Sequence, residues 1–191
     1  DGQLRTYRLD AIRALTVSGF TLSNSIVNGV NGTSAVDDEG SVSFSQLTGA
    51  AAISGCTISG GLEDNVRVAN ASGTLNRLTL QNTTIGANSP ALGDDGVFVE
   101  ASGTAVLNVT VTNCVFTSAR GDLLQCNALN GAVMNWVIVR NAFSNSHPGI
   151  VSGAGGTTFS GGGAGSAVSV TYDISNNTFR DAQGIALNVF K

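Results

Sequence analysis

The chain has 191 residues, a net charge of −4, 25 glycines and only 12% charged residues, and its length suits one domain with a sizeable core. The small net charge and the abundant β-branched residues argue against a disordered chain. The balance of 9 basic against 13 acidic residues argues against a nucleic-acid partner. No apolar run reaches the ~18 residues of a membrane-spanning helix, so no membrane span is expected. Abundant Val, Ile and Thr favour an all-β protein.

A six-residue pattern recurs along the chain and predicts one column of strands. It reads apolar, two variable residues, a small or Asn residue, one variable residue and apolar. Its six copies are residues 17–22, 53–58, 80–85, 111–116, 138–143 and 174–179. The copies begin 36, 27, 31, 27 and 36 residues apart. Recurrence at this period is typical of repeat folds.

A second pattern lies between these copies and predicts another column of strands. A polar or acidic residue is followed by alternating apolar positions at 64–68, 95–99, 122–126, 148–152 and 183–187. We expect 42–44 to supply this strand in the first repeat, and Leu4–Thr6 to occupy the same slot at the start of the chain. Turns of Gly, Asn and Ser and a third short strand complete each repeat. Residues 23–41 and the glycine-rich stretch 153–165 are expected to be insertions.

One unit of about 27 residues cannot enclose a core, whereas stacked units can. The predicted fold is therefore an all-β parallel β-helix of about six rungs, with three short strands per rung. Two apolar columns should line its interior: Val17/Ile53/Leu80/Val111/Ile138/Ile174 and Leu22/Ile58/Ile85/Phe116/Phe143/Phe179. A third column should form an inward bend with an asparagine ladder: Phe20/Cys56/Thr83/Cys114/Asn141/Asn177.

The stretch Ile-Ser-Asn-Asn-Thr-Phe at 174–179, followed by Gln-Gly-Ile-Ala-Leu at 183–187, carries a family resemblance. It resembles the right-handed parallel β-helix repeats of the pectin-lyase-like superfamily, of the bacterial secreted or surface type. The resemblance covers essentially the whole chain. It implies a right-handed coil, a single β-helix domain over residues 1–191, and an extracellular or cell-surface location.

Three aspartates, Asp64, Asp95 and Asp122, fall at the same place on consecutive rungs, just before a strand. Stacked carboxylates about 5 Å apart repel one another, share protons or hold a cation. These three residues are therefore candidate calcium ligands, and calcium is the only cofactor that the sequence suggests. We favour turn chemistry instead, in which each aspartate bonds to the backbone two residues further on.

The segment Gly93–Val97 contains Asp94 and Asp95 and resembles the paired-aspartate element of polygalacturonases. That resemblance implies Asp94, Asp95 and Asp122 as candidate catalytic carboxylates that act as general acid and base on a polysaccharide. The Gly-His-Gly and Arg-Ile-Lys elements of that family have no counterpart in this chain. We therefore favour a protein that is not an enzyme.

The two ends of the chain are expected to occupy the same strand slot, with Leu4–Thr6 matching Ile185–Leu187. Without caps, such ends would pair with another chain. The leading hypothesis is a structural segment of a longer rod, or a filament subunit, in an adhesin or surface layer that self-associates through its ends. The alternative is a carbohydrate-active enzyme or sugar-binding module that uses the acidic wall, with a polysaccharide as partner. The three cysteines are expected to be buried and free.

Overall fold

The computed structural model describes residues 3–7, 9–151, 154–162 and 166–190. Within these ranges the strands form three parallel sheets, and the helical content is one short 3₁₀ turn, η1 (Ala35–Asp37). No helix in the described part of the chain is long and apolar enough to cross a membrane.

Each of the three sheets takes one strand from every repeat. Sheet A consists of β1 (Gln3–Tyr7), β4 (Ile26–Asn31), β7 (Thr57–Ile58), β10 (Thr84–Ile85), β13 (Val115–Phe116), β16 (Ala142–Ser144) and β19 (Thr178–Arg180). Sheet B consists of β2 (Ile12–Leu15), β5 (Val42–Ser45), β8 (Val66–Asn70), β11 (Val97–Ala101), β14 (Leu124–Ala128), β17 (Thr157–Gly161) and β20 (Asn188–Phe190). Sheet C consists of β3 (Ser18–Ser23), β6 (Thr48–Ser54), β9 (Thr74–Gln81), β12 (Val106–Thr112), β15 (Val133–Val139) and β18 (Ser169–Ser175).

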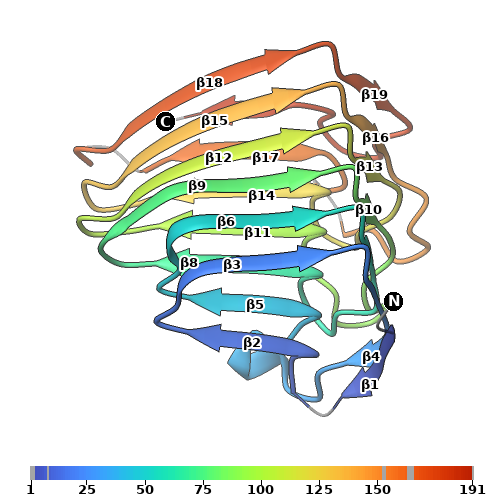
Figure 1. Ribbon diagram of the computed structural model, residues 1–191. Coiled ribbons are helices and arrows are strands. Elements are labelled where there is room, and N and C mark those ends of the chain that lie inside the picture. Colours follow the sequence, from blue (N-terminus) through green and yellow to red (C-terminus); the bar gives the residue numbers. More distant parts are fainter. Residues whose placement is uncertain (1–2, 8, 152–153, 163–165, 191) are drawn as a thin grey trace.

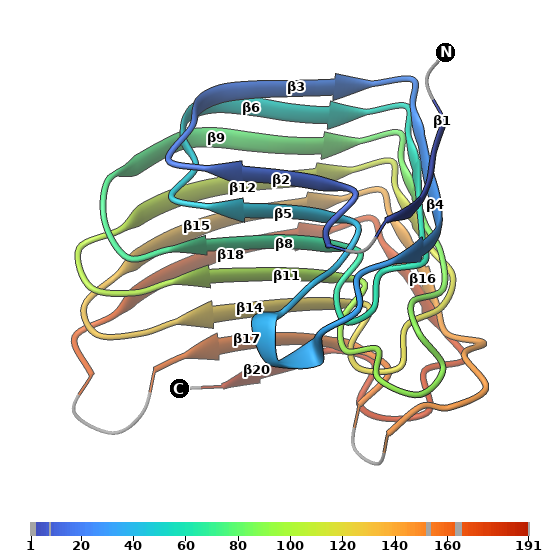
Figure 2. The ribbon, with the colours of Figure 1, turned by 90° about the horizontal axis from the view of Figure 1, so that it is seen from below.

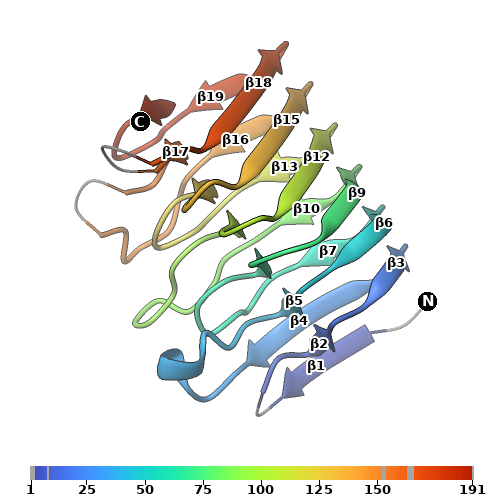
Figure 3. The ribbon, with the colours of Figure 1, turned by 90° about the vertical axis from the view of Figure 1, so that its left-hand side faces the viewer.

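The chain runs through sheets A, B and C in turn and then rises by one rung. Figure 1 shows the rungs stacked from blue at the bottom to red at the top, and Figure 3 shows the same stack from the side. Seen from below, sheets B and C face each other and sheet A joins them at one edge (Figure 2). Six strands in sheet C correspond to about six turns. The predicted parallel β-helix with three strands per rung is confirmed.

The predicted core columns are confirmed in the middle and upper rungs. Phe116, Phe143 and Phe179 stack with ring centroids 4.6 and 4.9 Å apart. Beside them, Ile138 pairs in register with Val111 below and Ile174 above. These stacks form because equivalent inward-facing residues of a parallel solenoid lie directly over one another.

A sharp corner between sheets C and A explains the recurring asparagines. One residue of each corner has a positive φ, a conformation that favours Gly and Asn. These corner residues are Asn24, Gly55, Asn82, Asn113, Arg140 and Asn176. Next to them runs the expected side-chain ladder: the Cys114 N–H donates to Asn141 Oδ1 at 2.9 Å, and the Asn141 N–H donates to Asn177 Oδ1 at 2.9 Å.

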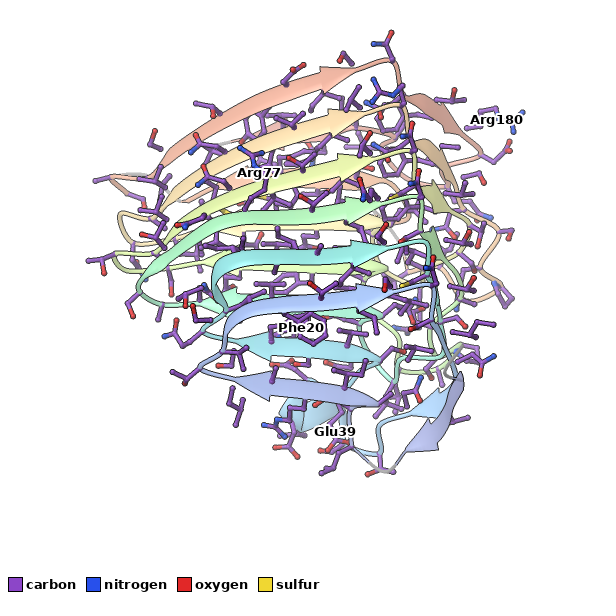
Figure 4. All side chains as sticks on the ribbon, in the orientation of Figure 1. Phe20, Glu39, Arg77 and Arg180 are labelled. Carbon is purple, nitrogen blue, oxygen red and sulfur yellow. The ribbon has the colours of Figure 1, made fainter. Side chains whose placement is uncertain are left out.

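The prediction was wrong for the first repeat, where the register is displaced by five residues. Leu22, not Val17, pairs with Ile53, and Val27, not Leu22, pairs with Ile58. Phe20 therefore lies in the interior on β3, where its ring meets Phe44 edge-on at 4.8 Å (Figure 4). The supposed insertion at 23–41 contains β4, and Leu4–Thr6 belongs to β1 of sheet A rather than to sheet B.

The last two strands of sheet B were also predicted in the wrong place. A strand was expected at 148–152, but this position in sheet B is taken by β17 (Thr157–Gly161). β17 lies inside the stretch 153–165, which was expected to be an insertion, and its Phe159 pairs with Cys126. Residues 152–153 and 163–165 of these two segments lie outside the described residues. The last strand was expected at 183–187, but it is β20 at Asn188–Phe190, in which Val189 pairs with Phe159. The chain therefore starts in sheet A and ends in sheet B, so its two ends do not share one strand slot.

The three cysteines, Cys56, Cys114 and Cys126, are buried and free, as expected. Burial raises the pKa of Cys114 to about 11 and that of Cys126 to about 12. Because the thiolate is the reactive form, these two side chains act as small apolar core residues.

We predict that Phe143→Ala lowers the free energy of unfolding by about 3–5 kcal/mol, because it removes the middle ring of the stack and leaves a cavity. Phe143 is 2% exposed, whereas Phe179 is only partly buried at the upper end. Phe179→Ala is therefore the matched control and should cost less. Chemical denaturation of both variants measures the difference, and an equal loss would contradict the assigned stacking.

Candidate functional site

Acidic side chains gather where the chain leaves sheet A and enters sheet B. The loops involved are residues 32–41, 59–65, 86–96 and 117–123, each of which connects a sheet A strand to the next sheet B strand. In Figure 2 such loops project at the corner between the two sheets. Because the rungs are stacked, side chains from different loops come close together here.

The aspartates expected to form a column do so, and they bond from rung to rung. Asp64 Oδ1 accepts the Asp95 N–H at 2.9 Å, and Asp95 Oδ1 accepts the Asp122 N–H at 2.7 Å. Asp122 Oδ1 in turn accepts the N–H groups of Gly155 and Gly156, at 3.1 and 3.2 Å. Each of these carboxylates thus caps the backbone of the rung above, whereas the sequence analysis expected a bond two residues along the same turn.

The first rung carries a further member of this column that the sequence analysis missed. Asp10 Oδ1 accepts the Gly40 N–H at 2.8 Å. Asp10 stands two residues before Ile12, the equivalent of Val66 on sheet B, and this spacing is the signal that could have revealed it. We call Asp10, Asp64, Asp95 and Asp122 the carboxylate ladder.

Three carboxylates come close enough together to share a ligand, and they are not the three expected. Oxygens of Asp64, Asp94 and Asp95 all lie within 4.8 Å of one another. Asp64 and Asp95 are only 3% and 1% exposed, whereas Asp94 is exposed. Asp122 is not part of this group, which we call the acidic cluster: Asp64, Asp94 and Asp95.

Arg67 on β8 closes one side of the acidic cluster. Its Nη1 lies 3.4 Å from Asp64 Oδ2, and its Nη2 lies 2.9 Å from Asp38 Oδ2. The guanidinium also stacks over the Phe98 ring, 4.7 Å from the centroid. Arg67 therefore neutralises part of the charge and shields Asp64 from solvent.

A second acidic column consists of Glu39, Glu63 and Asp94, each three residues before an aligned strand position on sheet B. The sequence analysis named Asp94 as a candidate but missed Glu39 and Glu63. The adjacent acids Glu63-Asp64 and Asp94-Asp95 were the visible signal. Their proximity to Asp38 could not be read from the sequence, because it depends on the fold of the loop at 32–41.

Burial and mutual repulsion hold protons on these acids. Burial raises the pKa of Asp64 to about 7, against the opposing effects of the Asp95 N–H and Arg67. Burial, followed by the charges of Asp64 and Asp94, raises the pKa of Asp95 well above its usual value. Burial and the neighbouring Asp38 raise the pKa of Glu63 to about 7. Burial also raises the pKa of Asp94, with the Asp122 charge adding to the effect.

The geometry is poorly suited to the catalytic roles considered for Asp94, Asp95 and Asp122. A general acid and base must both reach the scissile bond of a glycan. Asp94 is open to solvent, but Asp95 is almost completely buried and Asp122 is 8% exposed. Both of these also use an oxygen to cap backbone N–H groups. The arrangement is better suited to holding loops together or to holding a cation.

Comparisons with known proteins identify neither a family nor a relative for this chain. No protein-family model matches the chain. No curated protein and no solved structure matches it either. Its function must therefore be inferred from the fold and from the geometry of the acidic loops.

We predict that, in cation-free buffer, the free energy of unfolding falls as the pH rises from about 4 to about 7. Asp64 and Glu63 ionise near 3.8 and 4.5 when unfolded, but at about 7 in the folded chain. The folded state therefore binds more protons in this window, so deprotonation favours unfolding. Denaturant midpoints across the window measure the trend. Asp64→Asn should make the fall shallower, because only Glu63 then contributes fully, and exposed Asp37→Asn should leave it unchanged. A stability that rises with pH would contradict the prediction.

We predict that Asp122→Ala destabilises the loop at 154–156. The substitution leaves the Gly155 and Gly156 N–H groups without their acceptor, at about 1–3 kcal/mol for an unsatisfied buried donor. Asp122→Asn keeps an acceptor oxygen in place and should lose less. Equilibrium denaturation, with amide exchange at Gly155 and Gly156, measures both effects. Equal losses in the two variants would show that the capping bond is not the cause.

Proposed function

We propose that this chain is a structural segment of an extracellular or cell-surface β-helical protein, an adhesin, surface-layer protein or filament subunit of the pectin-lyase-like type. In this proposal, a second copy of the chain covers each end rung by head-to-tail stacking. The observation that carries the proposal is the open apolar interior at both ends of the solenoid.

The upper end leaves core-type side chains uncovered. A hollow of about 480 Å³ is lined by residues of β17, β18 and β20 and includes Val170, Tyr172, Val189 and Phe190. Val189 is 49% exposed, whereas Phe159, which pairs with it one rung below, is fully buried. Phe190 is equally exposed, but it pairs with Ser160, which is not part of the buried column. Exposed apolar clusters of this kind mark contact surfaces.

The lower end is open in a similar way. Ile12 and Ala14 face the interior from β2, where they pair with the buried Val42 and Phe44, but they are themselves only partly buried. Phe20 on β3 is also only partly buried. The edge strands are β1, β2 and β3 here and β19, β20 and β18 at the upper end, so each sheet presents one edge at each end. Unpaired strand edges are templates for further pairing. A head-to-tail contact of this kind repeats without closing and produces a filament.

A sugar-binding or carbohydrate-active function is the second candidate. The observation in its favour is the exposed Asp94 at the rim of the acidic cluster, on the loop that enters β11. A binding or cleavage assay with acidic and neutral polysaccharides addresses it, with Asp94→Ala as the variant. Saturable binding that Asp94→Ala abolishes would favour this candidate.

We predict that the purified chain forms rods whose length grows with concentration, in steps of roughly 34 Å, because sheets A and B each contribute seven strands at ~4.8 Å per strand. Val189→Asp places a charge in the open upper end and should yield monomers. Val115→Asp is the matched control, because Val115 is 42% exposed on β13 in the middle of the solenoid. Sedimentation and negative-stain electron microscopy measure the result.

Three outcomes would overturn stacking between copies. The first is a wild-type chain that stays monomeric at every concentration. The second is a Val189→Asp variant that assembles as well as Val115→Asp. The third is native material that forms rods but runs as a single long polypeptide on a denaturing gel, because the end would then be covered by the same chain rather than by a second copy.

A further inference from the structure

We propose that the acidic cluster, Asp64, Asp94 and Asp95, binds one divalent cation of the calcium type, which ties together the sheet A-to-B loops of two successive rungs. This site is independent of the proposed end-to-end stacking, because both loops lie in the middle of the solenoid. Asp64 comes from the loop between β7 and β8, and Asp94 and Asp95 come from the loop between β10 and β11. The cation would have a structural role.

The spacing of the carboxylate oxygens fits a calcium ion. One oxygen of each residue lies within 4.8 Å of the oxygens of the other two. Calcium binds oxygen ligands at about 2.3–2.6 Å, so two ligands on opposite sides of the ion are at most about 5 Å apart. The three carboxylate oxygens are therefore close enough together to bind one ion.

An unsatisfied oxygen provides independent support for a ligand at this place. Asp95 Oδ2 is buried and has no hydrogen-bond partner, while Oδ1 of the same carboxylate accepts the Asp122 N–H. The residue as a whole is 1% exposed. Buried polar groups are normally hydrogen-bonded or coordinate a metal, because an unpartnered buried polar atom is costly. A cation bound by Asp95 Oδ2 would give that oxygen its missing partner.

The acidic cluster and its surroundings contain more carboxyl groups than arginines. Asp38, Glu63 and Asp122 add to the negative potential of the three ligands. Arg67 pairs with Asp64 and Asp38, and Arg120 Nη1 donates to the Gly93 carbonyl at 3.2 Å. Among the described residues, no ion pair includes Asp94 or Asp95. Two arginines thus face six carboxyl groups.

The exposure of the three residues gives the ion a way in. Asp94 is exposed, whereas Asp64 and Asp95 lie behind it. Waters on the Asp94 side can complete a coordination sphere of 6–8 oxygens, which calcium tolerates in irregular geometry. Magnesium demands a near-ideal octahedron at about 2.0–2.1 Å and gives up its waters reluctantly, so it should bind more weakly here.

The experiment is a titration of the chelator-treated 191-residue chain with CaCl₂ alone at neutral pH. The thermal unfolding midpoint should rise progressively over about 0.1–10 mM calcium, because a ligand that binds only the folded state stabilises it. Isothermal titration calorimetry should show about one ion per chain, as one cluster of three carboxylates requires. MgCl₂ at equal concentration should give a smaller rise.

Asp94→Asn is the main variant, and it should abolish the calcium-dependent rise. The matched control is Asp37→Asn, which removes the same charge from an exposed residue of η1 and should keep the full rise. If Asp94→Asn does not fold, Asp95→Asn replaces it, because its amide oxygen can still accept the Asp122 N–H. A wild-type chain that does not respond to calcium would overturn the proposal. Equal responses in the cluster variant and in Asp37→Asn would also overturn it.

Discussion

The backbone groups at the corners of each rung impose the constraint on which this solenoid depends. In the straight segments, strand pairing gives the backbone N–H and C=O groups their hydrogen-bond partners. At a corner, some of these groups lie beyond the reach of any neighbouring strand. A side chain from the next rung provides the partner. Asn141 does so between sheets C and A, and Asn70 between sheets B and C, where it bonds both the N–H and the C=O of Leu47. Asp95 does so between sheets A and B.

These corner bonds explain a composition rich in Asn, Asp and Gly. Only a short polar side chain can turn back onto a backbone 5 Å away, and only certain residues tolerate the positive φ beside it. Where the bond uses a carboxylate rather than an amide, it also buries charge. The acidic cluster is thus a by-product of the way the solenoid turns its A-to-B corner, and its raised pKa values follow from that burial.

The sequence predicted the fold class and the middle rungs, where repeat lengths vary little and Gly or Asn marks every corner between sheets C and A except that of Arg140. It failed at the ends for a local reason. Val17–Leu22 and Leu22–Val27 both place apolar residues five apart, so the pattern could not choose between them. Thr157–Gly161 was hidden in a glycine-rich stretch, because its strand is defined by pairing with β14 and β20. The cluster of Asp64 with Asp94, Arg67 and Asp38 was beyond prediction, since it depends on loop conformations.

The carboxylate ladder has an evolutionary consequence. Asp64, Asp95 and Asp122 each need only a backbone N–H group in the rung above. Such a group is present whichever side chain the residue carries, proline excepted. Loss of residues 96–122, one repeat of 27 residues, would bring Asp95 beneath Gly155 and Gly156, with the same type of bond re-formed. Duplication of a repeat would be accommodated in the same way. A gene for such a chain can therefore change length by whole rungs without any compensating substitution at this corner.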